Sequence, residues 1–204
     1  LVGQFNVENL LGVLGVMHAC GIDFVRAVAA LPQLHPPPGR MQHVVMPAGP
    51  LAVIDYAHTP DALAKALAAL RPLVEARRLE GGGGKLWVVF GAGGDRDSGK
   101  RAAMGAAAAH GADVVIVTSD NPRSENAEAI ASQVAAGAAN ARELITMVDR
   151  SGAIAHAIAN AGPADVVLIA GKGHESYQII GAERLPFSDL SQARVALARR
   201  TGAT

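Results

Sequence analysis

The sequence predicts an α/β fold with a doubly wound, mostly parallel sheet that carries an antiparallel edge strand. Four short runs are apolar without polar alternation, which is typical of strands covered by helices on both faces. These runs lie at residues 51–54, 86–90, 114–117 and 166–169. Helical segments separate the runs, and right-handed crossovers then make the strands parallel. Each run ends abruptly in polar residues, and ligands of open α/β sheets bind beyond the carboxyl ends of the strands.

Composition narrows the class of partner. The 204 residues are 50% hydrophobic but only 3% aromatic, and the formal net charge is zero. No electrostatic signal therefore points to nucleic acid or to an anionic membrane, and no apolar run approaches the roughly 18 residues of a membrane-spanning helix. The single cysteine, Cys20, excludes an internal disulfide and predicts a cytoplasmic protein. Because Cys20 falls in an apolar helical pattern, we expect a buried, inert thiol.

Two helices are expected before the alternating region. Residues 6–18 have helical periodicity with Asn6 as the N-cap, and Asp23 caps a second helix. Residues 36–39, three prolines and a glycine, are stiff and non-helical, as linkers between domains are. Two helices of about a dozen residues cannot bury a core of their own. We therefore expect them to end a preceding domain, and the chain, which starts at Leu1, to be part of a longer polypeptide.

The remaining elements complete the alternation. Thr59 caps a helix that Pro60 opens, and residues 177–180 with the turn at Gly181 predict the antiparallel edge strand. The expected helices are residues 60–71, an alanine-rich segment ending at 110, 125–139, 151–160 and a last one from 188 or 189 to 200, with a flexible linker at 81–84 and a short strand at 144–148.

The loop after the run at 86–90 nearly matches two phosphate-binding patterns. The G-x-x-x-x-G-K-[ST] pattern has Arg101 in place of the hydroxyl that holds magnesium, and G-x-G-x-x-G has Arg96 in place of its third glycine. A phosphotransferase built on residues 94–100 remains an alternative. The glycine-rich turn also aims Arg96 into the crevice, where a guanidinium can grip a carboxylate with two parallel hydrogen bonds. Otherwise Arg96 would pair with Asp95 or Asp97 on a solvated loop.

Two further strand-end loops bring charges of both signs. The run at 114–117 is followed by the motif D-N-P-R, and the run at 166–169 by A-G-K-G-H-E. Asp120 or Asn121 could instead cap a helix. Taken together, Arg96 and Arg123 set against Asp120 and Glu175 predict a site for a molecule with ammonium and carboxylate groups. Such a molecule is an amino acid charged at both ends.

The first strand-end loop, D-Y-A-H-T-P-D, contains His58 beside Tyr56. A lone histidine lacks the second ligand that a metal site needs, and no serine or cysteine stands in a nucleophile motif. Contact with a nucleotide and a purely structural role remain open for His58.

The order of D-Y-A-H-T-P-D, G-G-D-R-D-x-G-K-R, S-D-N-P-R-S-E and G-K-G-H-E, each at a strand end, resembles the C-terminal domain of the bacterial Mur ligase family. Within it, the chain is most similar to members that add meso-2,6-diaminopimelate to UDP-MurNAc-L-Ala-D-Glu in peptidoglycan precursor synthesis. The resemblance implies a Rossmann-like amino-acid-binding domain over residues 41–204. It also implies that residues 1–40 are the last helices of an incomplete central ATP-binding domain.

The resemblance also assigns residues to ligands. Its amino-acid site is Arg96, Asp120, Asn121, Pro122, Arg123, Gly171 and Glu175, and its ATP site includes Asn6, Asn9, Arg40, His58 and Asp61. Members that add lysine lack the motif's arginine, and Arg123 would partner the extra carboxylate of diaminopimelate.

The catalytic residues, the carbamylated lysine and the ligands of Mg²⁺ in the family have no counterpart in this chain. The resemblance therefore implies an ATP- and Mg²⁺-dependent ligase, monomeric, of which this part alone is inactive. A stand-alone amino-acid-binding or regulatory module without catalysis is the alternative.

Overall fold

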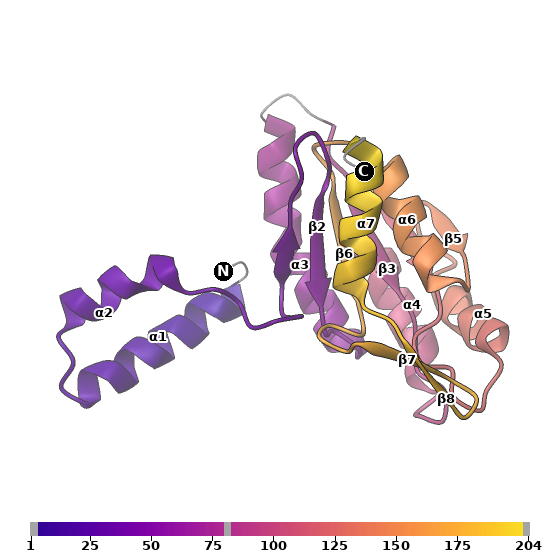
Figure 1. Ribbon diagram of the computed structural model, residues 1–204, viewed down its shortest axis with the longest axis horizontal. Coiled ribbons are helices and arrows are strands. Elements are labelled where there is room, and N and C mark those ends of the chain that lie inside the picture. Colours follow the sequence, from indigo (N-terminus) through magenta and orange to yellow (C-terminus); the bar gives the residue numbers. More distant parts are fainter. Residues whose placement is uncertain (1–3, 80–82, 202–204) are drawn as a thin grey trace.

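The computed structural model describes residues 4–79 and 83–201. Within these ranges the chain forms a six-stranded sheet between two layers of helices, a separate two-stranded hairpin, and a helix pair that extends away from the body (Figure 1). The linker expected at residues 81–84 lies in part outside the described residues. The predicted fold class is confirmed.

The main sheet has the strand order β1-β2-β6-β3-β4-β5, in which β1 runs antiparallel to β2 and the other pairs are parallel. Every residue of β3, β4 and β6 is buried, as expected for apolar runs covered on both faces. The strands are β1 (Gln42–Val44), β2 (Leu51–Asp55), β3 (Leu86–Phe90), β4 (Val114–Val117), β5 (Leu144–Thr146) and β6 (Val166–Ala170).

The antiparallel edge strand is not where the sequence placed it. That edge is β1, whereas Tyr177–Ile180 forms β7, which pairs with β8 (Glu183–Pro186) in a hairpin outside the main sheet. In β7 only Gln178 is buried, unlike the central strands of the main sheet, which are buried throughout. The hairpin instead lies at the carboxyl edge of the sheet, where it contacts the loop after β4.

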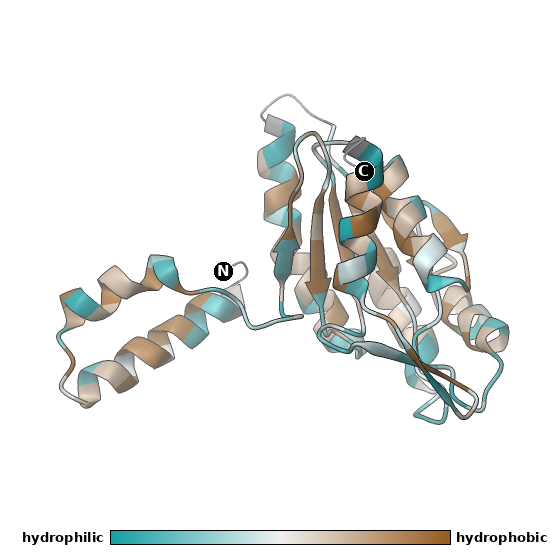
Figure 2. Ribbon diagram, viewed as in Figure 1, coloured by the Kyte–Doolittle hydropathy of each residue, from teal (hydrophilic) through white to brown (hydrophobic). Residues whose placement is uncertain are grey.

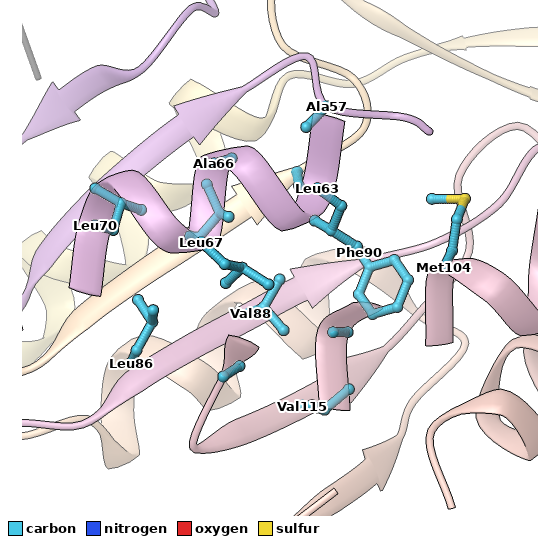
Figure 3. Packing of buried hydrophobic residues seen from close by; sticks show 14 of the residues in the cluster. Ala57, Leu63, Ala66, Leu67, Leu70, Leu86, Val88, Phe90, Met104 and Val115 are labelled. Atoms are coloured by element: carbon cyan, nitrogen blue, oxygen red, sulfur yellow. The ribbon is translucent and has the colours of Figure 1, made fainter. Parts of the chain in front are cut away.

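Helices cover both faces of the sheet and divide its core in two (Figure 1). On one face Leu63 and Leu67 pack against Val88 and Phe90 (Figure 3). The helices of that face are α3 (Pro60–Leu79), α4 (Lys100–Gly111) and α5 (Ala127–Gly137), and those of the other are α6 (Arg150–Asn160) and α7 (Asp189–Thr201). In Figure 2 the central strands of the sheet are largely hydrophobic, whereas β1 and parts of α3 and α7 are hydrophilic.

Helix α3 continues well beyond the predicted end at residue 71, with Pro72 inside it. A proline in a helix removes one hydrogen bond to the carbonyl four residues earlier. That carbonyl belongs to Ala68, and both Ala68 and Pro72 are exposed, so water can satisfy it. The leucines before and the valine after Pro72 are buried against the sheet, and this packing outweighs the proline.

The N-terminal helix pair is α1 (Gln4–Ala19) and α2 (Phe24–Ala30), followed by a 3₁₀ turn at Leu31–Gln33. Asp23 caps α2 as predicted, accepting a 3.0 Å hydrogen bond from the amide of Arg26. Two predictions here were wrong: Asn6 lies inside α1 and does not cap it, and Cys20 is exposed. The helix pair extends from the body (Figure 1), and large apolar side chains such as that of Val25 are exposed. Among the described residues no helix is long and apolar enough to cross a membrane.

Candidate functional site

A cavity of about 590 Å³ lies beyond the carboxyl ends of the parallel strands. The polar loops that follow β2, β3, β4 and β6 all line it, because parallel strands end at the same edge. Of the seven residues predicted for an amino-acid site, six line this cavity, namely Arg96, Asp120, Asn121, Arg123, Gly171 and Glu175. Pro122 is buried and is not among the lining residues. Four loops distant in sequence therefore converge as predicted.

The basic side of the cavity is formed by Arg96 and Arg123. Arg123 has a left-handed backbone (φ +53°), and its Nη1 donates a 2.7 Å hydrogen bond to the carbonyl of Gly94. Within the described residues no hydrogen bond involves its Nη2 or Nε. Arg96 is exposed and makes no ion pair with any described residue. Both guanidinium groups therefore keep donors available for an anionic ligand.

The carboxylates of the two residues next to Arg96 contact other residues and not Arg96. Asp95 accepts a 2.6 Å hydrogen bond from the hydroxyl of Ser124, which lowers the pKa of Asp95. Asp97 lies 3.6 Å from the ammonium of Lys100. The alternative in which Arg96 pairs with one of them is thus not what the structure adopts. The contact between Asp95 and Ser124 also joins the loop after β3 to the loop after β4.

Arg101, the residue that breaks the phosphate-loop pattern, is buried and connects the same two loops. Its guanidinium makes a bidentate ion pair with Glu125, at 2.7 and 2.8 Å, and donates a hydrogen bond to the carbonyl of Gly93. The hydrogen bond from Arg101 lowers the pKa of Glu125. Through Arg101 the loop after β3 therefore holds the D-N-P-R loop in place, while Lys100 is exposed. This arrangement does not favour a phosphotransferase site.

The acidic side of the cavity is organised around Lys172, which the sequence analysis did not single out. Its ammonium is fully buried and lies 3.4 Å from Asp120, 3.0 Å from the side-chain oxygen of Asn121 and 3.2 Å from Glu175. Burial raises the pKa of Asp120 despite the nearby cations Arg150 and Lys172. A lysine between two glycines reads as a solvated loop residue. The only sequence signal was its place two residues after the end of a buried strand.

Neither Asp120 nor Asn121 caps a helix, because α5 is capped by Asn126, whose side chain accepts a 2.7 Å hydrogen bond from the amide of Ala129. Asn121 instead donates to Glu175 at 3.0 Å and accepts from the backbone of Ile179. Its side chain therefore links the loop after β4 to the loop after β6 and to the hairpin.

Behind the acidic side lies a fully buried ion pair between Arg150 and Asp189, at 2.7 and 2.8 Å. Burial alone would lower the pKa of Arg150, but the Asp189 carboxylate raises it. Arg150 also donates to the carbonyls of Ser119 and Ala170, at the ends of β4 and β6. The pair thus connects the N-termini of α6 and α7 to the two strands whose loops carry the acidic groups.

The hairpin β7–β8 closes the cavity on the side of the D-N-P-R loop. Gln178 is buried and donates to the hydroxyl of Ser119 and to the carbonyl of Asp120, at 2.9 and 2.7 Å. Tyr177, in β7, lines the cavity. The guanidinium of Arg184, in β8, stacks on the Tyr177 ring, 3.6 Å from its centre. The hairpin therefore fixes one wall of the site.

A second cavity of about 210 Å³ lies between the linker and α3. Of the residues predicted to contact ATP, Asn6 and Arg40 line it, and Arg40 also lies 4.9 Å from the centre of the Tyr56 ring. His58 lines the larger cavity instead. Asn9 and Asp61 line neither cavity, and both are exposed.

No group of three or more histidine, cysteine, aspartate or glutamate side chains suited to a metal ion occurs in the part of the chain that the structure describes. Among the described residues, no serine or cysteine lines the larger cavity, and Cys20 lies in the N-terminal helix pair. What the larger cavity offers is recognition of a ligand with charges of both signs.

Comparison with known proteins gives consistent matches. The sequence model of a family described as "Mur ligase, glutamate ligase domain" matches residues 39–173. The UDP-N-acetylmuramoyl-L-alanyl-D-glutamate--2,6-diaminopimelate ligase of Acidovorax sp. (strain JS42) is 52% identical over 202 residues, 99% of this chain and 39% of that protein. The ligase of the same name from Pseudomonas aeruginosa is 50% identical over 97% of this chain and 39% of its own length.

Solved structures agree. One of a UDP-N-acetylmuramoyl-L-alanyl-D-glutamate--2,6-diaminopimelate ligase superposes with a TM-score of 0.75 at 42% identity, covering 98% of this chain and 40% of that one. A folylpolyglutamate synthase/dihydrofolate synthase from Yersinia pestis, complexed with AMPPNP and a Mn ion, has a TM-score of 0.52 at 25% identity, over 70% of this chain and 30% of its own. The chain thus spans about two fifths of the length of the diaminopimelate ligases that it matches.

Proposed function

Since this chain belongs to the Mur ligase family, we propose that it forms the amino-acid-binding domain of an ATP-dependent ligase. In this proposal the whole protein joins meso-2,6-diaminopimelate to UDP-MurNAc-L-Ala-D-Glu and so forms a carbon–nitrogen bond in peptidoglycan precursor synthesis. The high identity to proteins named for that reaction supports it. A reaction driven by ATP would take place in the cytoplasm, which agrees with the expectation from the single cysteine.

One observation carries the proposal: two guanidinium groups and two carboxylates line the larger cavity. Arg96 and Arg123 have donors available, and Asp120 and Glu175 line the same cavity. Diaminopimelate carries a carboxylate and an ammonium at each end of a short chain. A cavity of about 590 Å³ is in the size range of small-molecule sites, so the ligand and the charge pattern match.

Arg123 is the residue that we propose to select diaminopimelate over lysine. The two amino acids differ by one carboxylate, and a desolvated carboxylate without a partner costs several kcal/mol. Arg123 has Nη2 and Nε free among the described residues, and its Nη1 is anchored on the carbonyl of Gly94. An anchored guanidinium loses little conformational entropy on binding, which favours selective recognition of that carboxylate.

We propose that the smaller cavity takes part of ATP. Pro36 and Ala66 are among its apolar lining residues, and Asn6 and Arg40 provide hydrogen-bonding groups. This mixture fits a flat base with polar edges. The nucleotide analogue bound by the similar synthase supports ATP as a ligand, whereas the choice of cavity rests on the lining residues alone. When bound in the whole protein, ATP would supply the free energy of amide formation, and Mg²⁺ would be held by residues outside this chain.

The domain division follows from the same reasoning. We propose that residues 1–40 are the last helices of the central ATP-binding domain and that residues 41–204 are the amino-acid-binding domain. The chain alone would then bind ligands without catalysing the reaction, and the whole protein would act as a monomer. The exposed apolar side chains of α1 and α2 agree with helices taken from a larger core.

Calorimetric titration of the chain, and of the whole protein that contains it, tests the proposal. Meso-diaminopimelate should bind, and L-lysine should bind at least about tenfold more weakly, because Arg123 then lacks its partner carboxylate. Arg123→Ala should remove most of this preference, whereas Lys85→Ala, at the opposite edge of the sheet and 3.7 Å from Glu143, should not. Tighter binding of lysine than of diaminopimelate contradicts the substrate assignment.

A further inference from the structure

We propose that Lys172 is a positioning residue for the ammonium-binding side of the larger cavity. Its buried ammonium holds one oxygen each of Asp120 and Glu175 and thereby presents the other oxygen of each carboxylate to the ligand's ammonium. The inference rests on the proposed function, because it explains how that site recognises its amino acid.

The hydrogen bonds around Lys172 divide the carboxylate oxygens into two sets. Lys172 contacts Oδ1 of Asp120 at 3.4 Å and Oε2 of Glu175 at 3.2 Å. Oε2 of Glu175 also accepts a 3.0 Å hydrogen bond from Asn121. Oδ2 of Asp120 and Oε1 of Glu175 have no hydrogen-bond partner within the described residues. The inner oxygens are thus held by the protein, and the outer ones remain for a ligand.

Lys172 also sets the net charge of the acidic side. Asp120 and Glu175 carry two negative charges and Lys172 one positive charge, while the buried pair of Arg150 and Asp189 behind them is neutral. The acidic side therefore carries one net negative charge when its carboxylates are ionised, which suits one ammonium. Without Lys172 two carboxylates would repel each other in a poorly solvated place, and the repulsion would drive them apart or favour a protonated form.

The surroundings leave Lys172 little freedom. Its side chain has 0% exposure, and its ammonium lies 5.7 Å from the centre of the Tyr177 ring. The glycines on either side, Gly171 and Gly173, have positive φ angles of +115° and +53°. A side chain at Gly171 would come within 2.8 Å of Oδ2 of Asp120. The loop is therefore shaped to turn Lys172 inward while its backbone stays close to the ligand side.

Steady-state kinetics of the full-length ligase that carries this chain tests the inference. In Lys172→Met, the KM for meso-diaminopimelate should rise about tenfold or more, because the two outer oxygens lose their fixed geometry. The KM for ATP should change by less than about twofold, since the second cavity is distinct. Lys172→Arg keeps the positive charge and should restore part of the loss. Lys85→Met, which removes an exposed lysine at the other edge of the sheet, should behave as wild type.

Inhibition by 1,5-diaminopentane separates positioning from charge. This compound has the ammonium groups of diaminopimelate without its carboxylates. If Lys172 only repelled cations, its removal would strengthen inhibition by the diamine. If Lys172 positions the carboxylates, Lys172→Met should weaken that inhibition although the site becomes more negative.

The outcomes distinguish the two proposals. A wild-type protein that does not use diaminopimelate overturns the proposed function and this inference with it. A wild-type protein that uses it, together with a folded Lys172→Met variant whose KM for diaminopimelate is unchanged or whose inhibition by the diamine is stronger, overturns the role of Lys172 alone. If Lys172→Met does not fold, a folded Lys172→Arg decides, because it keeps the charge but changes the hydrogen-bond geometry: a KM for diaminopimelate above that of wild type supports the inference, and a KM equal to that of wild type opposes it.

Discussion

Arg123 combines a side chain that lines the larger cavity with a strained backbone. Its φ of +53° lies in the left-handed region, where a residue other than glycine pays a conformational cost of about 1 kcal/mol. Asp95 in the neighbouring loop has a φ of +51°. The strain is maintained by the ladder bonds of Arg123 to the hairpin, where its amide donates to Ile179 and its carbonyl accepts from Gly181. Arg123 lines the larger cavity and Asp95 lies in the adjoining loop, and strained residues of this kind cluster at binding sites.

This strain predicts different stabilities for two variants that lose the same guanidinium. Arg123→Gly and Arg123→Ala should both weaken binding of meso-diaminopimelate, but only glycine relieves the left-handed conformation. We expect Arg123→Gly to be more stable than Arg123→Ala by about 1 kcal/mol in urea unfolding. Equal stabilities would mean that the backbone at Arg123 is not strained.

The charged residues that line the larger cavity were predictable from the sequence, whereas the buried charged residues behind them were not. Arg96, Arg123 and Glu175 stand in polar clusters directly after apolar runs, which is a local signal. Lys172 and Arg150 are buried only because partners far along the chain neutralise them. A charged residue in a single sequence is most often solvated, so such burial leaves no local trace.

At the scale of elements, strands were predicted more accurately than their surroundings. The four uninterrupted apolar runs became β2, β3, β4 and β6, because burial on both faces requires that composition. The end of α3 was missed since tertiary packing overrode the effect of Pro72. The position of the antiparallel edge was missed because β7 pairs with β8 instead of with the main sheet, a choice that depends on contacts to the loop after β4.

Asp113 connects several elements through its hydrogen bonds and makes the stability of the fold depend on pH. Its carboxylate accepts hydrogen bonds from the amide of Leu86 at 2.8 Å, from Arg71 at 2.6 Å and from Arg142 at 2.8 Å. Burial pushes the pKa of Asp113 upward, but these hydrogen bonds and the two cations lower it below its ordinary value of 3.8. A carboxyl with a lowered pKa stabilises the fold above its ordinary pKa, and this contribution disappears as the pH falls through the lowered value.

Asp113→Asn should therefore be less stable than wild type at pH 7, by about 2 kcal/mol. The difference should shrink as the pH falls below 3.8 and through the lowered pKa of Asp113, because the carboxyl of the folded wild-type protein then becomes protonated as well. Urea unfolding of both proteins at pH 7 and at about pH 2.5 measures this. A difference that is the same at both values would show that the charge of Asp113 does not contribute.

At the scale of the whole molecule, the linker before β1 is in contact with the loop after β6. Gly39 has a φ of +68°, and a side chain there would overlap the backbone of Gly173 and His174. The next two residues are also held, since Arg40 stacks on Tyr56 and the amide of Met41 donates to Asp55 at 2.9 Å. The segment that leads from the helix pair into the sheet thus packs on the loop that carries Lys172 and Glu175. Movement of the helix pair would be transmitted to the acidic side of the cavity.

Substitution of Gly39 tests this connection, with Gly21 as a matched control. Both glycines have positive φ, but a side chain at Gly21 (φ +80°) would meet nothing within 4 Å. Gly21→Ala should cost about 1 kcal/mol of stability and leave the affinity for meso-diaminopimelate unchanged. Gly39→Ala must displace the backbone at Gly173, so we expect an affinity at least about fivefold weaker although Gly39 does not line the larger cavity. Equal affinities of the two variants in calorimetric titration would show that the linker and the site are independent, and the geometry of the helix pair could then vary without any effect on amino-acid binding.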